Sequence, residues 1–71
     1  MTLEECWVYQ IVNSASNDLN KVSIDEVSRA VNSYRSFMPD DYIRTFNVGG
    51  RRWLDTEDRE ALADLIKDAR K

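Results

Sequence analysis

Apolar residues near the start of the chain recur every three or four positions, which is the spacing of one face of an α-helix. This stripe consists of Leu3, Trp7, Val8, Ile11, Val12, Ala15 and Leu19. Thr2 precedes the stripe and Glu5 follows three residues later, which is the pattern of a capping box at a helix start. Small polar residues gather from residue 13 onward and weaken the helix. We therefore predict a helix over residues 3–17.

A second stripe follows another capping box, formed by Ser23 and Glu26. Its members are Ile24, Val27, Val31, Tyr34 and Met38. Pro39 disfavours helical geometry in the residue before it, so the helix should end near that position. We predict a second helix over residues 24–36.

The next segment, residues 39–48, supports two interpretations. Proline followed by Asp40 and Asp41 is typical of a helix start, because carboxylates favour the positive end of the helix dipole. Residues that favour a strand come next, namely Ile43, Thr45, Phe46 and Val48. We expect a short helical turn near Pro39 that leads into a strand over residues 42–48, and the alternative is a helix over this segment.

Gly49 and Gly50 separate this strand from a second β-compatible run, Arg51 to Leu54. Two glycines supply the positive φ angles that a two-residue hairpin turn needs. An amphipathic helix should begin after Asp55, with acidic residues at its start and basic residues at its end, as the helix dipole favours. Its apolar stripe comprises Ala61, Leu62, Leu65, Ile66 and Ala69.

These elements predict a small α+β fold, a single domain over residues 1–71 with three helices and one wing-like β-hairpin. If residues 39–48 are helical, the alternative is an all-α protein of four helices. The helices should pack their stripes around Trp7, Ile11, Val27, Val31, Leu62 and Leu65. We also expect Cys6 to be a small buried apolar residue.

Charge and composition limit the function. The chain has 71 residues and a net charge of −3, which argues against wholesale binding to nucleic acid. One cysteine allows no intramolecular disulfide, so a reducing, cytoplasmic setting is expected. No apolar run approaches the ~20 residues of a membrane span, and the acidic start lacks the basic region of a signal peptide.

The residues needed for catalysis are scarce. Without histidine, a serine or cysteine nucleophile lacks its usual base, and a zinc site of histidine and cysteine cannot be assembled. Adjacent carboxylates occur at Glu4/Glu5, Asp40/Asp41 and Glu57/Asp58, near predicted helix starts, where capping explains them. The only two glycines belong to the hairpin turn, so no phosphate loop is present. We predict a protein that is not an enzyme and has no metal or cofactor.

The candidate binding residues lie on the predicted hairpin. They are Tyr42, Arg44, Phe46, Arg51, Arg52 and Trp53. Arginine, tryptophan and tyrosine are enriched at interface hot spots. Phe46 and Trp53 have the alternative role of covering the core, and the arginines have the alternative of pairing with the acidic helices. The first strand carries one charge, so its edge is poorly protected and is a candidate for pairing with an extended partner segment.

The segment from Val48 to Asp55 reads Val-Gly-Gly-Arg-Arg-Trp-Leu-Asp, and Glu57 and Asp58 follow. With residues 24–31 as a first helix, this segment resembles the winged helix-turn-helix of excisionase and MerR-type domains. The resemblance implies DNA binding, with the wing arginines on phosphates. The chain departs from that pattern where the recognition helix should lie, because carboxylates at Asp40 and Asp41 would repel a phosphate backbone.

In overall size and character, from Met-Thr-Leu-Glu-Glu-Cys-Trp at its start to the lysine at its end, the chain is also similar to small phage-encoded transcription regulators of the lytic Xanthomonas phage type. This resemblance implies non-catalytic binding to host RNA polymerase, at the β′ N-terminal region and the β flap. It implies inhibition of initiation by σ displacement, together with antitermination. The sequence therefore predicts a protein–protein regulator, with a DNA-binding winged helix-turn-helix as the alternative.

Overall fold

The computed structural model describes residues 2–15, 19, 21–37 and 43–71. Within these residues, three helices and one two-stranded antiparallel hairpin form a small α+β domain, which confirms the predicted fold class. The elements are α1 (Leu3–Ala15), α2 (Ile24–Phe37), β1 (Thr45–Val48), β2 (Arg51–Leu54) and α3 (Thr56–Arg70). The alternative of four helices is wrong, because residues 45–48 form a strand.

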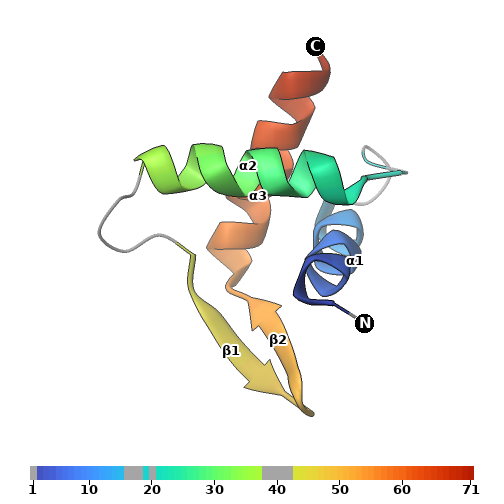
Figure 1. Cartoon of the computed structure of the whole chain (residues 1–71), viewed down its shortest axis with the longest axis vertical. Coiled ribbons are helices and arrows are strands. Elements are labelled where there is room, and N and C mark those ends of the chain that lie inside the picture. Colours follow the sequence, from blue (N-terminus) through green and yellow to red (C-terminus); the bar gives the residue numbers. More distant parts are fainter. Residues whose placement is uncertain (1, 16–18, 20, 38–42) are drawn as a thin grey trace.

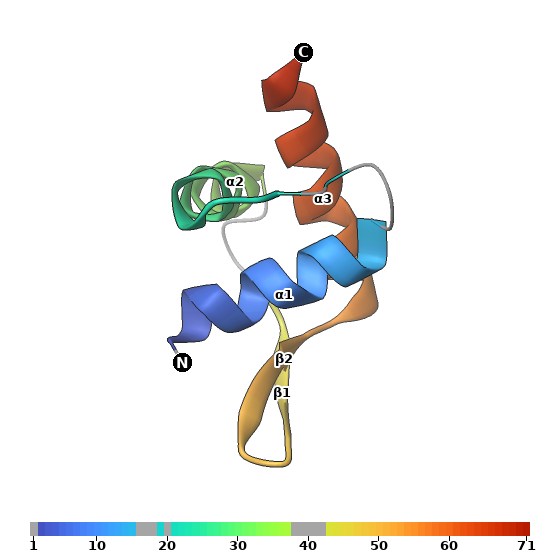
Figure 2. The ribbon, with the colours of Figure 1, turned by 90° about the vertical axis from the view of Figure 1, so that its right-hand side faces the viewer.

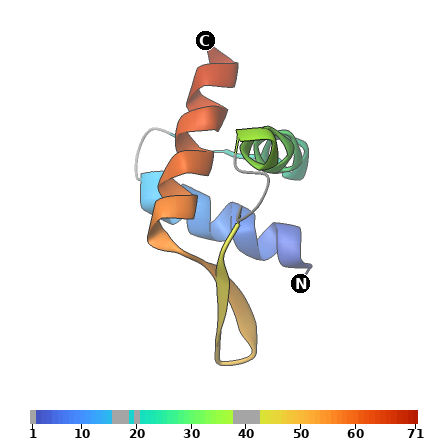
Figure 3. The same ribbon diagram turned by 90° about the vertical axis from the view of Figure 1, so that its left-hand side faces the viewer.

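The helices form the body of the molecule and the hairpin extends from it. Helix α2 crosses α3, and the hairpin points away from the end that carries the C-terminus (Figure 1). A view turned by 90° shows α1 lying across the base of the hairpin (Figure 2). The opposite side view shows the Gly-Gly turn as the part of the hairpin farthest from the helices (Figure 3). The hairpin is therefore a projection supported at its base.

The helix starts follow the predicted capping boxes. The Ser23 amide donates to the Glu26 carboxylate, and the Glu26 amide donates to the Ser23 hydroxyl, so the box before α2 is reciprocal. The Thr2 hydroxyl accepts from the Glu5 amide at the start of α1. Helix α2 ends at Phe37, one residue beyond the prediction. Residues 16 and 17, the expected end of the first helix, lie outside the described residues.

The core lies where the three helices and the base of β2 meet. Trp7, Ile11, Val27, Val31 and Leu62 are buried as predicted, whereas Leu65 is only partly buried against them. Cys6 is buried, which confirms its assignment as an interior residue. The structure adds further members, which are Leu19, Ala30, Tyr34, Leu54, Ala63 and Ile66. Two fully buried polar residues, Gln10 and Asp58, were not predicted.

The hairpin turn has the predicted geometry, but the first strand is shorter than expected. Gly49 and Gly50 have φ angles of 59° and 80°, as a two-residue turn of type I′ requires. Strand β1 starts at Thr45 instead of residue 42, and Tyr42 lies outside the described residues. The carbonyl of Arg44 accepts from the Asp55 amide, but its own amide donates to the Asp58 carboxylate. The strand ladder therefore ends at Thr45, because the next backbone amide, that of Arg44, donates to Asp58 of α3 and not to β2.

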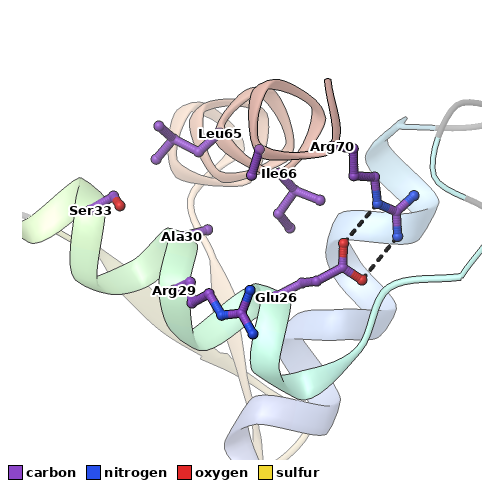
Figure 4. Close-up of a pocket in the computed structure, with 8 residues that line it drawn as sticks. Glu26, Arg29, Ala30, Ser33, Leu65, Ile66 and Arg70 are labelled. Carbon is purple, nitrogen blue, oxygen red and sulfur yellow. Dashed lines mark hydrogen bonds and ion pairs between the residues drawn. The ribbon is translucent and has the colours of Figure 1, made fainter.

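A surface ion pair ties the start of α2 to the end of α3. The Arg70 guanidinium lies 2.7 Å from the Glu26 carboxylate, beside a shallow groove between the two helices (Figure 4). The hydrogen bond from Arg70 and the amide of Ser23 lower the pKa of Glu26 to about 2. This tie lies far along α3 from the hairpin, so it fixes the helices and not the candidate site.

Candidate protein-binding surface on the hairpin

Helix α1 holds the outer edge of β2 through one buried side chain. The Gln10 amide donates to the carbonyl of Arg52 at 3.1 Å, and the Gln10 carbonyl accepts from the amide of Leu54. The Cys6 thiol donates to the same Arg52 carbonyl at 3.2 Å. Gln10 is fully buried, and its bond with the Leu54 amide forms away from water, where an unmade bond is costly. One edge of the hairpin is thus covered by α1.

A buried carboxylate fixes the other side of the hairpin base. Asp58 accepts from the Arg44 amide at 2.6 Å and from the Tyr34 hydroxyl at 2.7 Å. The bond to Asp58 raises the pKa of Tyr34, and burial of the ring adds to the effect. Asp58 therefore joins α2, α3 and the residue before β1 at a single point. Together with Gln10, it sets the direction in which the hairpin projects.

The strand register sorts the hairpin side chains onto two faces. Phe46 pairs with Trp53, and Val48 pairs with Arg51. Because side chains alternate along a strand, these four share the face opposite to the buried Leu54. Tyr9 of α1 packs edge-on against Trp53, with ring centroids 6.3 Å apart and an interplanar angle of 72°. We call the surface formed by Tyr9, Phe46, Val48, Arg51 and Trp53 the hairpin face.

The hairpin face exposes apolar surface to water. Tyr9 is 54% exposed, Phe46 is 53% exposed and Val48 is 51% exposed, while Trp53 between Tyr9 and Phe46 is half-buried. Arg51 lies exposed at the border of this patch. An exposed apolar patch with a polar rim is typical of an interaction site, and aromatic residues and arginine are frequent hot-spot residues.

The predicted site residues do not all lie on one surface. Phe46, Trp53 and Arg51 lie together on the hairpin face. Arg52 is exposed on the other face, beside Asn47. Tyr42 lies outside the described residues.

Arg44 differs from the other two arginines of the hairpin region. Its guanidinium lies 3.0 Å from the Glu57 carboxylate and 3.7 Å from that of Asp58. The bond to Glu57 and the charge of Asp58 raise the pKa of Arg44, so it stays charged within α3's acidic start. For Arg51 and Arg52 no ion pair occurs with any residue in the described part of the chain. Arg44 is exposed but paired, so Arg51 and Arg52 are the two cations of the hairpin region that have no ion pair with a described residue.

Sequence reasoning missed two members of the hairpin face. Tyr9 falls outside the apolar stripe of the first helix, and an aromatic residue on the polar face of that helix was the available signal. Val48 was assigned to the strand but not to the site. The pairing of Val48 with Arg51 places Val48 on the hairpin face. This pairing depends on both strands, so it cannot be derived from one strand alone.

Other kinds of site have weaker support in the described residues. Three shallow hollows there have volumes of about 130, 270 and 260 Å³, below the ~300 Å³ at which small-molecule pockets begin. Among residues 2–15, 19, 21–37 and 43–71, no three histidine, cysteine or acidic side chains are grouped as metal ligands. None of the described helices is long and apolar enough to cross a membrane.

Comparison with known proteins adds no relative. No protein-family model, no characterised protein and no solved structure matches the chain. Function is therefore inferred from the geometry of the hairpin face.

Proposed function

We propose that this chain is a non-catalytic binding protein that docks on a protein partner through the hairpin face. The observation that supports this proposal is the grouping of Tyr9, Phe46 and Val48, each about half-exposed, around Trp53 on a projecting hairpin. A rigid aromatic patch loses little conformational entropy when it is covered. The buried contacts of Gln10 and Asp58 hold that patch in place before a partner arrives.

The candidate partner is bacterial RNA polymerase, at the β′ N-terminal region and the β flap. This choice depends on the resemblance of the sequence to small phage-encoded regulators. In that role the chain is a transcription regulator of the bacterial cytoplasm, which is the host cytoplasm if the chain is phage-encoded. It inhibits initiation by displacing σ and promotes antitermination by remaining bound to the enzyme.

DNA binding through a wing is the alternative, and the charges support it less well. Arg44 is paired with α3, which leaves Arg51 and Arg52 for phosphates. Two phosphate contacts give weak binding that salt abolishes easily. The base of the hairpin also adjoins the exposed carboxylate of Glu57, which repels a nucleic-acid backbone.

Binding of the intact chain to purified bacterial RNA polymerase tests the proposal. We expect the double variant Phe46→Ala/Val48→Ala to bind at least about tenfold more weakly, since truncation of a hot-spot side chain costs about 2 kcal/mol or more. Both side chains are exposed, so folding should be unaffected. Phe37→Ala is the matched control, because Phe37 is 71% exposed at the end of α2 and should leave the affinity unchanged.

Duplex DNA is measured beside the polymerase, over a range of salt concentrations. If the chain binds DNA with a steep salt dependence and does not bind polymerase, the wing alternative replaces the proposal. If polymerase binds equally well to both alanine variants, the hairpin face is not the docking surface.

A further inference from the structure

The two edges of the hairpin differ in what covers them. On β2, the outward carbonyl of Arg52 and the outward amide of Leu54 are bonded to Gln10 and Cys6 of α1. Strand β1 lies on the other side of β2 and has one neighbouring strand in the sheet. Within the described residues, no helix or strand is paired with the far edge of β1. In the part of the chain that the structure describes, the hairpin is therefore open to pairing on the β1 side and covered on the β2 side.

The register identifies the groups at this open edge. In an antiparallel pair, backbone groups point alternately toward the partner strand and away from it. Arg52 and Leu54 point away from β1, because they bond to α1. Their partners across the ladder are Asn47 and Thr45. The amide and carbonyl of Asn47 and of Thr45 therefore face outward at the edge of β1.

The open edge lacks the usual protection against strand pairing. Proteins protect exposed edges with charged residues, proline or bulges. Strand β1 reads Thr-Phe-Asn-Val, with no charge and no proline, and its register with β2 is continuous. Phe46, Asn47 and Val48 are all exposed. This strand has the properties of a template for an added strand.

We propose that β1 accepts an extended segment of the protein partner as a third strand, and that this segment alternates apolar and acidic residues. The inference depends on the proposed function, because it specifies how the hairpin face binds a protein. Apolar side chains of the segment lie beside Phe46 and Val48 on the hairpin face. Acidic side chains lie beside Asn47 on the other face, within the field of Arg52.

Charge complementarity favours such a segment over a second copy of this chain. The residues from Thr45 to Leu54 carry two arginines and no acid. Pairing β1 with its own copy brings two positive hairpins together over only four residues per strand, and like charges oppose this. An acidic segment removes that repulsion and adds attraction.

A synthetic peptide that alternates valine and glutamate over seven residues is the probe. Binding of the labelled peptide to the intact chain is followed by fluorescence polarisation, with a valine–lysine peptide as the charge control. Two N-methylated forms, one blocked at the glutamate amides and one at the valine amides, test strand addition directly. The glutamate amides face β1 in an antiparallel pair, and the valine amides face it in a parallel pair. Loss of binding in one methylated form alone supports the inference, and equal affinities of the two forms overturn it.

A variant at the edge gives an independent test. Asn47→Pro removes the outward amide and should weaken peptide binding about tenfold or more, because it leaves a bonding partner unsatisfied. Asn47→Ala removes only the side chain and should stay within about twofold. Protection of the Leu54 amide from hydrogen exchange, which depends on Gln10, shows that the variant hairpin is folded. Equal peptide affinities of a folded Asn47→Pro variant and of Asn47→Ala overturn the inference.

The polymerase measurement separates this inference from the proposed function. If Phe46→Ala/Val48→Ala no longer binds polymerase and Asn47→Pro still does, the hairpin face binds without use of the β1 edge. That result overturns this inference and leaves the proposed function standing. If the peptide binds with the expected methylation pattern and polymerase does not bind, strand addition is supported and polymerase is rejected as the partner.

Discussion

Gln10 is a fully buried amide whose oxygen and nitrogen bond to the amide of Leu54 and the carbonyl of Arg52. We expect Gln10→Leu to lower the free energy of unfolding by about 1–3 kcal/mol. The leucine has a similar volume, but it leaves the buried amide of Leu54 without a partner, at about 1–3 kcal/mol. The carbonyl of Arg52 keeps the Cys6 thiol as a donor. Urea unfolding followed by tryptophan fluorescence measures the change.

Asn13→Leu provides the control for this residue, because Asn13 is exposed on the same helix. Its effect should stay within about 0.5 kcal/mol. If the two variants have the same unfolding midpoint, the bonds of Gln10 do not hold the hairpin.

Gln10 and Asp58 also show where single residues cannot be predicted from sequence. Asp58 lies four residues before Leu62, on the apolar stripe of α3, and this spacing was the available signal. Its place in the first turn of α3 instead predicts a carboxylate that serves the helix dipole, because acids are common there. Its partners, Tyr34 and the amide of Arg44, are 24 and 14 residues away along the chain. Burial of the carboxylate follows from those distant contacts.

At the scale of elements, the ion pair between Glu26 of α2 and Arg70 of α3 should make the free energy of unfolding decrease at acid pH. The pKa of Glu26 is lowered to about 2 in the folded protein, so the tie stabilises the fold above about pH 4.5 and is lost as the pH falls toward 2. Since the pair lies at the surface and solvent screens it, the loss should be small. Unfolding measured from pH 6 to pH 2.5 should show a smaller loss in Arg70→Gln than in the unchanged chain.

Lys71→Gln removes the same charge one residue further along and serves as the control. It should keep the acid dependence of the unchanged chain. Parallel pH curves for Arg70→Gln and the unchanged chain would contradict the role of this pair.

Helix starts and turns were predictable from the sequence where neighbouring residues determine them. The capping boxes at Thr2 and Ser23 and the Gly-Gly turn are local signals. The structure has the turn, both bonds of the Ser23 box and the bond from the Glu5 amide to the Thr2 hydroxyl. The predicted start of β1 was wrong, because the Arg44 amide donates to the carboxylate of Asp58 in α3 and does not join the strand ladder. The hairpin face was only partly predicted, because Tyr9 joins it through the packing of α1 on β2.

At the scale of the whole molecule, charge is unevenly distributed. The net charge is −3, and because the segment from Thr45 to Leu54 carries +2, the remaining residues carry −5. A positive projection on a negative body should orient the chain as it approaches an acidic surface. Charges at an interface rim act mainly on the association rate, and salt screens them over about 10 Å at 0.1 M.

We therefore expect Arg51→Gln/Arg52→Gln to slow association with RNA polymerase several-fold at low salt, with little change in the dissociation rate. The difference should vanish at high salt, and stopped-flow or surface binding kinetics measure both rates. Arg29→Gln/Lys71→Gln removes two exposed charges that lie outside the hairpin and produces the same net charge. If net charge alone governed the encounter, the two double variants would have the same association rate. If only the hairpin variant associates more slowly, the position of the charges and not their number sets the association rate. The hairpin is then the part of the chain that approaches the partner first.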